Sequence, residues 1–130
     1  MKKLFTILAI AFTCLLTAKA QTSFSCIHRD FCEWNENTQK YDQCKGYDES
    51  SLFVMNKDET MFVHTIEDMK STYYVSDKEY DKVLNVFTYF VTSDVGNKYM
   101  CVFDIDHKEI RMVSVSRLTT IVVFYVKAIF

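Results

Sequence analysis

The sequence contains no proline and only two glycines, Gly46 and Gly96, among its 130 residues. No repeat, low-complexity tract or linker divides it, so we expect one domain. Positive charge is not in excess either, with 15 lysines and arginines against 17 acidic residues. A nucleic-acid partner is therefore not expected, because displacing counterions from phosphates needs a basic patch.

The sequence also lacks a recognisable catalytic motif. G-x-S-x-G is absent, so no serine nucleophile is identified, and we expect no cofactor. His107 falls in a predicted turn. His64 shares a strand face with Phe62 and Ile66 and has no acid two residues away. We therefore expect His64 to be a hydrogen-bonded core residue and not a catalytic base, since a general base also needs a partner.

Carboxylates are clustered, but not in a pattern that selects a chemistry. Asp104, Asp106 and Glu109 form a D-x-D-x2-E string. The string lacks the glycine turn and the twelve-residue spacing of an EF-hand calcium loop. We expect it to be a solvated hairpin turn, since aspartate favours turns. No pair of carboxylates stands out as the acid and base of a glycosidase.

Residues 1–20 have the order of segments that is typical of a secretory signal peptide. Lys2 and Lys3 precede an uncharged apolar run over residues 4–17, and Ala18-Lys19-Ala20 follows it. A membrane-spanning helix needs about 20 apolar residues, which is more than this run supplies. The sequence therefore predicts cleavage after Ala20 and export to a bacterial periplasm or the extracellular space. A lipid anchor at Cys14 is the alternative, and the residues before it fit that motif poorly.

The expected mature chain is a single β domain over residues 21–130. Loss of three lysines leaves 12 basic against 17 acidic residues, a net charge near −5. An anionic membrane surface is disfavoured for the same reason as nucleic acid. Twenty aromatic residues in the whole chain indicate a globular rather than a disordered composition.

Period-2 alternation dominates the mature sequence and predicts strands. It is clearest at Tyr99, Cys101, Phe103 and Ile105. Polar breaks containing asparagine, aspartate or glycine separate the apolar runs, each short enough for a hairpin. Residues 76–82 are polar and are expected to form a loop or one helical turn. We predict an antiparallel up-and-down meander of seven to nine strands that curls into a small barrel or half-barrel, because a long open meander exposes its edges.

Four cysteines remain after processing: Cys26, Cys32, Cys44 and Cys101. An even count in an exported small domain favours disulfides. A hairpin folded at residues 37–39 would place Cys32 opposite Cys44, which leaves Cys26 for Cys101. A metal site made by Cys26, His28, Cys32 and Cys44 is disfavoured, because the spacing matches no zinc signature.

Function stays open between two main classes. The first is a non-catalytic binding module for a small apolar ligand or a protein partner, because aromatic residues are abundant on the predicted strands. The second is a small barrel hydrolase or isomerase that uses a carboxylate or His64. A small outer-membrane barrel is a further alternative, suggested by alternation in the last run up to Phe130. The sequence identifies no ligand-binding residue and no metal ligand.

Overall fold

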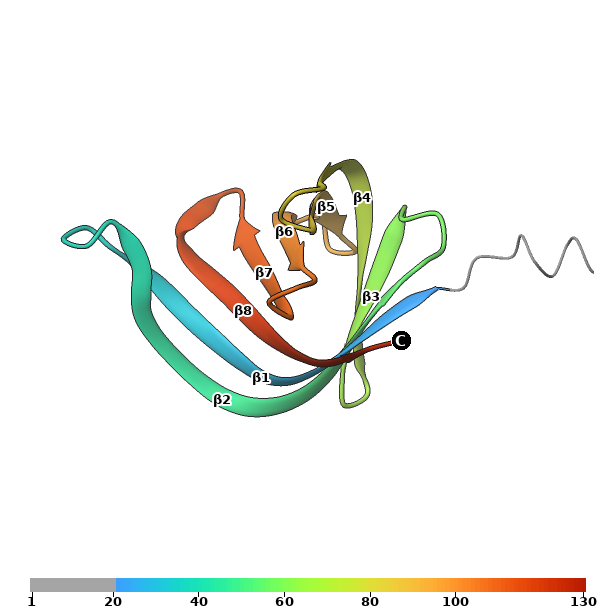
Figure 1. The fold of residues 1–130 in the computed structure, drawn as a ribbon, viewed down its shortest axis with the longest axis horizontal. Coiled ribbons are helices and arrows are strands. Elements are labelled where there is room, and N and C mark those ends of the chain that lie inside the picture. The colour runs from blue at the N-terminus through green and yellow to red at the C-terminus, as the bar shows by residue number, and fades with distance from the viewer. Residues whose placement is uncertain (1–20) are drawn as a thin grey trace, which may run out of the picture.

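Residues 21–130 form one closed β-barrel in a computed structural model of the chain, which describes these residues only (Figure 1). The expected signal peptide, residues 1–20, lies outside the described residues. Within residues 21–130, no helix is long and apolar enough to cross a membrane.

Eight antiparallel strands make the barrel, each paired with its neighbour in sequence, and β1 pairs with β8 to close it. The predicted up-and-down barrel is confirmed. The short hairpins leave no room for crossovers, so the meander closes its own edges. The strands are β1 (Thr22–Asn35), β2 (Lys40–Met55), β3 (Met61–Ile66), β4 (Met69–Asp81), β5 (Val86–Ser93), β6 (Lys98–Asp104), β7 (Glu109–Ser114) and β8 (Arg117–Ile129).

Aromatic rings fill the middle of the barrel. Phe53 and Phe62 are fully buried, and the Phe53 ring centroid lies 5.0 Å from that of Phe124 and 6.1 Å from that of Phe103. Four different strands supply these four rings, so their packing ties opposite walls together. The rings close the middle, and one cavity lies towards each end of the barrel.

Two local features differ from the sequence prediction. The polar residues 76–81 belong to β4, not to a loop or helical turn. A β-bulge at Ser76 shifts the register, and the ladder then continues from Asp77 opposite Phe90 to Asp81 opposite Val86. These β4 residues are polar because both faces of the strand are largely exposed there. Pairing with an apolar neighbour therefore overrides local composition.

The first hairpin is the longest in the barrel. Its strands β1 and β2 have 14 and 16 residues. β2 pairs with β3 only from Ser51 onwards, so its first half has β1 as its one strand partner and sweeps away from the barrel as an arm (Figure 1). The Tyr41 hydroxyl donates to the Leu118 carbonyl, which ties the arm to the start of β8.

One of the two expected disulfides is present. Cys32 faces Cys44 across the β1–β2 ladder and is bonded to it. Cys26 and Cys101 are instead free and buried, which corrects the expected second bridge. β1 and β6 are not neighbours in the barrel, and aromatic side chains share the interior between the walls. Counting cysteines could not reveal this separation.

Thiol titration tests the covalent state. Burial raises the pKa of Cys26 to about 12 and raises that of Cys101 as well, so neither forms the reactive thiolate near neutral pH. We expect native residues 21–130 to react slowly with a chromogenic disulfide, and two thiols to react once this chain is unfolded without reductant. Fewer than two would indicate a second disulfide.

The Cys32–Cys44 bridge closes a loop with a sequence separation of 12 residues. Replacing both cysteines by serine should lower the free energy of unfolding by about 2–3 kcal/mol, since the unfolded chain regains loop entropy. Urea unfolding of the double variant beside the native protein measures this. Equal midpoints would show that the bridge does not stabilise the arm.

Candidate functional site

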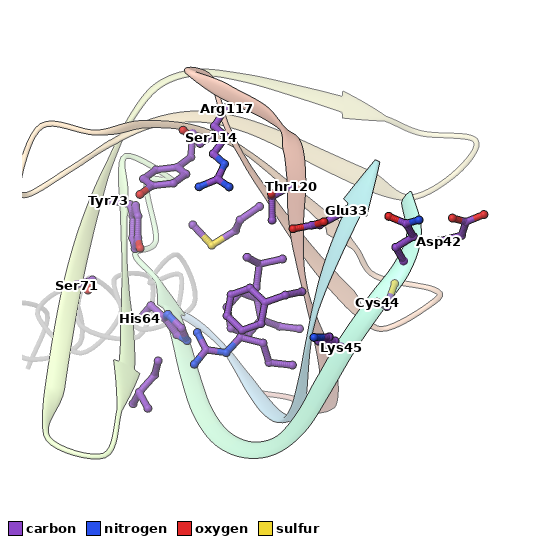
Figure 2. Close-up of a pocket in the computed structure, with 18 residues that line it drawn as sticks. Glu33, Asp42, Cys44, Lys45, His64, Ser71, Tyr73, Ser114, Arg117 and Thr120 are labelled. Carbon is purple, nitrogen blue, oxygen red and sulfur yellow. The ribbon is translucent and has the colours of Figure 1, made fainter. Parts of the chain in front are cut away.

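A cavity of about 1000 Å³ opens at one end of the barrel, and we call it the cup. Its mouth lies among the β1–β2, β3–β4, β5–β6 and β7–β8 hairpins. Figure 2 shows side chains from several strands surrounding the same space, with His64 and Tyr73 on one side and Glu33 and Lys45 on the other. The cup is therefore a concave site bounded by most of the sheet.

The walls of the cup are mainly apolar and aromatic. Tyr73 and Tyr99 meet edge to face with their ring centroids 5.8 Å apart. Burial raises the pKa of Tyr73 to about 12, so this phenol stays neutral. The other apolar wall residues are Phe31, Ile66, Met112, Val122 and Phe124. Walls of this composition suit an apolar molecule.

A buried ion pair lies in the wall of the cup on β1 and β2. Arg29 Nη2 donates to Glu49 Oε2 at 2.7 Å, and both side chains are 17% exposed. The same nitrogen donates to the Tyr47 hydroxyl. The guanidinium carbon lies 5.2 Å from the Phe31 ring centroid and 5.5 Å from that of Phe124. Aromatic faces and a carboxylate thus compensate the arginine for its loss of water.

His64 lies on the floor of the cup, where β3 meets the aromatic middle. Its ring stacks on Phe53 at a centroid distance of 4.0 Å and is only 5% exposed. Burial, with a smaller contribution from the positive charge of Arg29, lowers the pKa of His64 to about 4. The ring is therefore neutral near pH 7. Its predicted burial beside Phe62 on the inner face of β3 is confirmed.

One detail of His64 differs from the expectation. Its Nε2 atom has no hydrogen-bond partner, although a hydrogen-bonded core histidine was expected. Two other buried side-chain atoms, on β1 and β2, are also without a partner: Arg29 Nε and Glu49 Oε1. A buried polar group with no partner costs about 1–3 kcal/mol. The floor of the cup thus carries unused hydrogen-bonding capacity.

Charges around the cup are balanced. Lys45 and Arg117 lie near the mouth with Glu33 and Asp42, and Figure 2 shows these side chains at the edges of the space. Deeper in the wall, Arg29 is neutralised by Glu49. The cup therefore offers no excess of either sign to a ligand.

A smaller cavity of about 530 Å³ lies at the opposite end of the barrel. The Tyr89 hydroxyl donates to Glu59 Oε1 at 2.8 Å, and Lys78 donates to the other oxygen of Glu59 at 3.0 Å. These contacts satisfy the polar groups near that opening. The larger cup is the stronger candidate site, because buried polar atoms there have no partner.

A separate polar network lies on the outer face of the sheet, across β1, β2 and β8. His28 bonds Asp48 through Nδ1 and Asp30 through Nε2, each at 2.8 Å, and the Tyr125 hydroxyl donates to Asp30 at 2.9 Å. The hydrogen bonds to Asp48 and Asp30 raise the pKa of His28. Both ring nitrogens contact carboxylates, which favours the doubly protonated form of His28.

The remaining sequence candidates have separate local roles. Asp104 accepts from His107 in a turn, Asp106 accepts from Asn85, and Glu109 pairs with Arg111. The D-x-D-x2-E string therefore does not converge on one point. The disulfide also removes Cys32 and Cys44 from the disfavoured metal set, since a bridged sulfur is no thiolate ligand.

Sequence reasoning missed Arg29, Glu49 and Ser51. Arg29 and Glu49 are 20 residues apart in the chain and meet only because β1 and β2 pair. The one sequence pattern that could point to them is alternation along the strand, in which a charged residue falls on the inward face. A β-bulge between Cys26 and His28 shifts that register, so simple alternation could not find them.

The pKa values of His64 and His28 should be displaced in opposite directions from the usual histidine value. We expect NMR titration to give a pKa of about 4 for His64 and a raised value for His28. His64 then makes the fold less stable as the pH falls from about 6.5 towards 4, because only the unfolded chain takes up its proton readily. His28 stabilises at low pH and loses this effect as the pH rises through its raised pKa. Two coincident titrations would contradict the structure.

Gly46 leaves room for the outer network. A Cβ there would collide with Asp30 Oδ1 and His28 Nε2. Gly46→Ala should push these side chains apart, return the pKa of His28 towards its usual value and destabilise the fold by about 1–3 kcal/mol through overpacking. NMR titration and urea unfolding measure the two effects. An unchanged His28 pKa would show that the network tolerates the methyl group.

Comparison with known proteins gives no relative for this chain. No family model, no curated protein and no solved structure matches it. Any conclusion on function therefore depends on the geometry and chemistry of the cup.

Proposed function

We propose that the protein is a non-catalytic binding protein that takes up a small, mainly apolar molecule in the cup. The cavity of about 1000 Å³ is the observation that carries this proposal. Ligand sites are typically concave, apolar and largely pre-formed, with a few polar groups that orient the ligand. Aromatic and aliphatic walls with a polar floor give the cup this character.

The filled middle of the barrel supports a pre-formed site. Phe53, Phe62 and Phe103 pack against one another with centroid distances between 5.5 and 6.1 Å. Rings packed this closely resist collapse of the space above them. The Cys32–Cys44 bridge and the Tyr41–Leu118 contact hold the arm beside the mouth. The cup therefore needs little rearrangement to receive a ligand.

The hydrolase or isomerase alternative has less support. Within residues 21–130, no ion pair joins His64 to a carboxylate. A histidine base usually needs such a partner to orient its ring. Glu49, on β2, is bonded to Arg29. These contacts favour binding over proton transfer.

The outer-membrane alternative also has less support. Ionic contacts lie on the outer side of the sheet, namely His28 with Asp30 on β1 and Arg111 with Glu109 on β7. Charged residues facing lipid are destabilising near the middle of a bilayer. A surface of this kind suits water better than lipid.

An uncharged fluorescent probe, N-phenyl-1-naphthylamine, tests the proposal. We expect it to bind the mature chain and to brighten in the apolar cup. Val122 lies on the cup wall, so Val122→Trp should fill part of the space and weaken probe binding at least about tenfold, which corresponds to ~1.4 kcal/mol.

The control is Val83→Trp. Val83 is 92% exposed in the β4–β5 turn, so this variant adds the same ring far from the cup and should bind the probe like the native protein. Absence of probe binding to the native chain would refute a pre-formed apolar site. Equal weakening by both variants would place the probe elsewhere.

A further inference from the structure

We propose that the ligand is an uncharged amphiphile whose hydroxyl or similar neutral head is bound at the floor of the cup by His64 and Arg29. This inference rests on the proposed function and specifies the class of molecule. Its basis is that two residues lining the cavity, His64 and Arg29, each have a buried polar atom without a partner.

His64 is the central residue of this floor. It is 95% buried, borders the cavity and has no partner at Nε2. Figure 2 shows its ring directed towards the space enclosed by the walls. Ser71, which also lines the cup, lies directly opposite His64 on β4. A head group arriving from the mouth therefore meets a small polar area beneath apolar walls.

The charge balance selects a neutral head. The Arg29–Glu49 ion pair and the neutral ring of His64 leave the floor without net charge. A carboxylate head would bring a second negative charge close to Glu49. An ammonium head would bring a second positive charge close to Arg29. Either ion would lose its water without gaining a full counter-charge, which is costly.

Hydrogen bonding selects a head that both donates and accepts. Arg29 Nε–H is a donor without a partner, while His64 Nε2 serves as donor or acceptor according to its tautomer. One alcohol hydroxyl donates one bond and accepts up to two. It therefore matches the mixed floor better than a carboxylate, which only accepts.

The walls fit the apolar part of such a molecule. Tyr73 and Phe124 rise from the floor, and Met112 and Val122 lie on the walls above it. The partnerless atoms of His64 and Arg29 belong to residues that line the cup but are themselves closed to water, so we expect the head group to reach them by displacing the His64 ring. The ligand is therefore expected to enter head first.

Three probes with the same ten-carbon chain separate the head groups: 1-decanol, decanoate and decyltrimethylammonium. Each is titrated at pH 8 against the mature chain loaded with N-phenyl-1-naphthylamine. We expect decanol to displace the fluorophore at a concentration at least about tenfold lower than either ion, since the ions lose hydration without compensation. If decanoate or the ammonium compound is the most effective, the neutral-head inference is wrong.

Two variants test the role of His64. His64→Phe keeps an aromatic ring against Phe53 and should weaken decanol binding by about fivefold, the loss expected for one hydrogen bond. It should weaken decanol binding more than it weakens binding of the fluorophore, whose affinity is measured in the same variant. His107→Phe makes the same change in an exposed turn outside the cup and should change neither affinity. Unaltered decanol binding in His64→Phe would overturn the assignment of the head group to this residue.

A measurement on the native protein does not depend on the folding of any variant. Decanol should shift the ¹⁵N signals of the His64 imidazole and leave those of His28, on the outer face, unchanged. The two proposals fail separately. If the fluorophore does not bind, the proposed function fails, whereas if it binds and decanol leaves His64 unshifted, only the head-group assignment fails.

Discussion

Four phenylalanine rings across the middle of the barrel are the constraint on which the other features depend. Phe53, Phe62, Phe103 and Phe124 come from four strands and contact one another edge to face or tilted. A chain of this size has little apolar surface to bury, and these rings concentrate it in one layer. The strands extend beyond that layer, so the cavities lie at the ends. The cup is thus a consequence of where the core is placed.

Period-2 alternation predicted the strands. The short turns between them predicted the barrel, because they force neighbouring strands to pair. The prediction worked where one face is clearly apolar, as at Cys101 and Phe103 on β6, both fully buried. It was weaker where both faces are apolar, as in β5, where Tyr89 and Val91 are the buried side. It failed for residues 76–81, which are polar although they form strand. Local composition indicates which residues are buried. A strand segment that is exposed on both faces therefore shows no apolar alternation from which it could be predicted.

The candidate site was less accessible from the sequence than the fold. His64 could be placed inside from its neighbours alone, since the inner face of β3 also carries Phe62. The contacts that give His64 its environment come from other strands: Phe53 on β2, Phe124 on β8 and the charge of Arg29 on β1. Their registers depend on bulges in β1 that no local pattern reveals. The site therefore depends on pairings between segments that are distant in the sequence, which local patterns do not reveal.

The polar groups at the floor of the cup lower the stability of the barrel. Each buried polar atom without a partner costs about 1–3 kcal/mol, and a phenylalanine in place of His64 would continue the stack on Phe53 without that penalty. The Arg29–Glu49 pair is likewise no better for stability than apolar residues of similar volume. In His64 and Arg29, groups that a stable core would exclude line the cup. A ligand with a matching head removes the penalty on binding, which couples occupancy of the cup to the stability of the barrel.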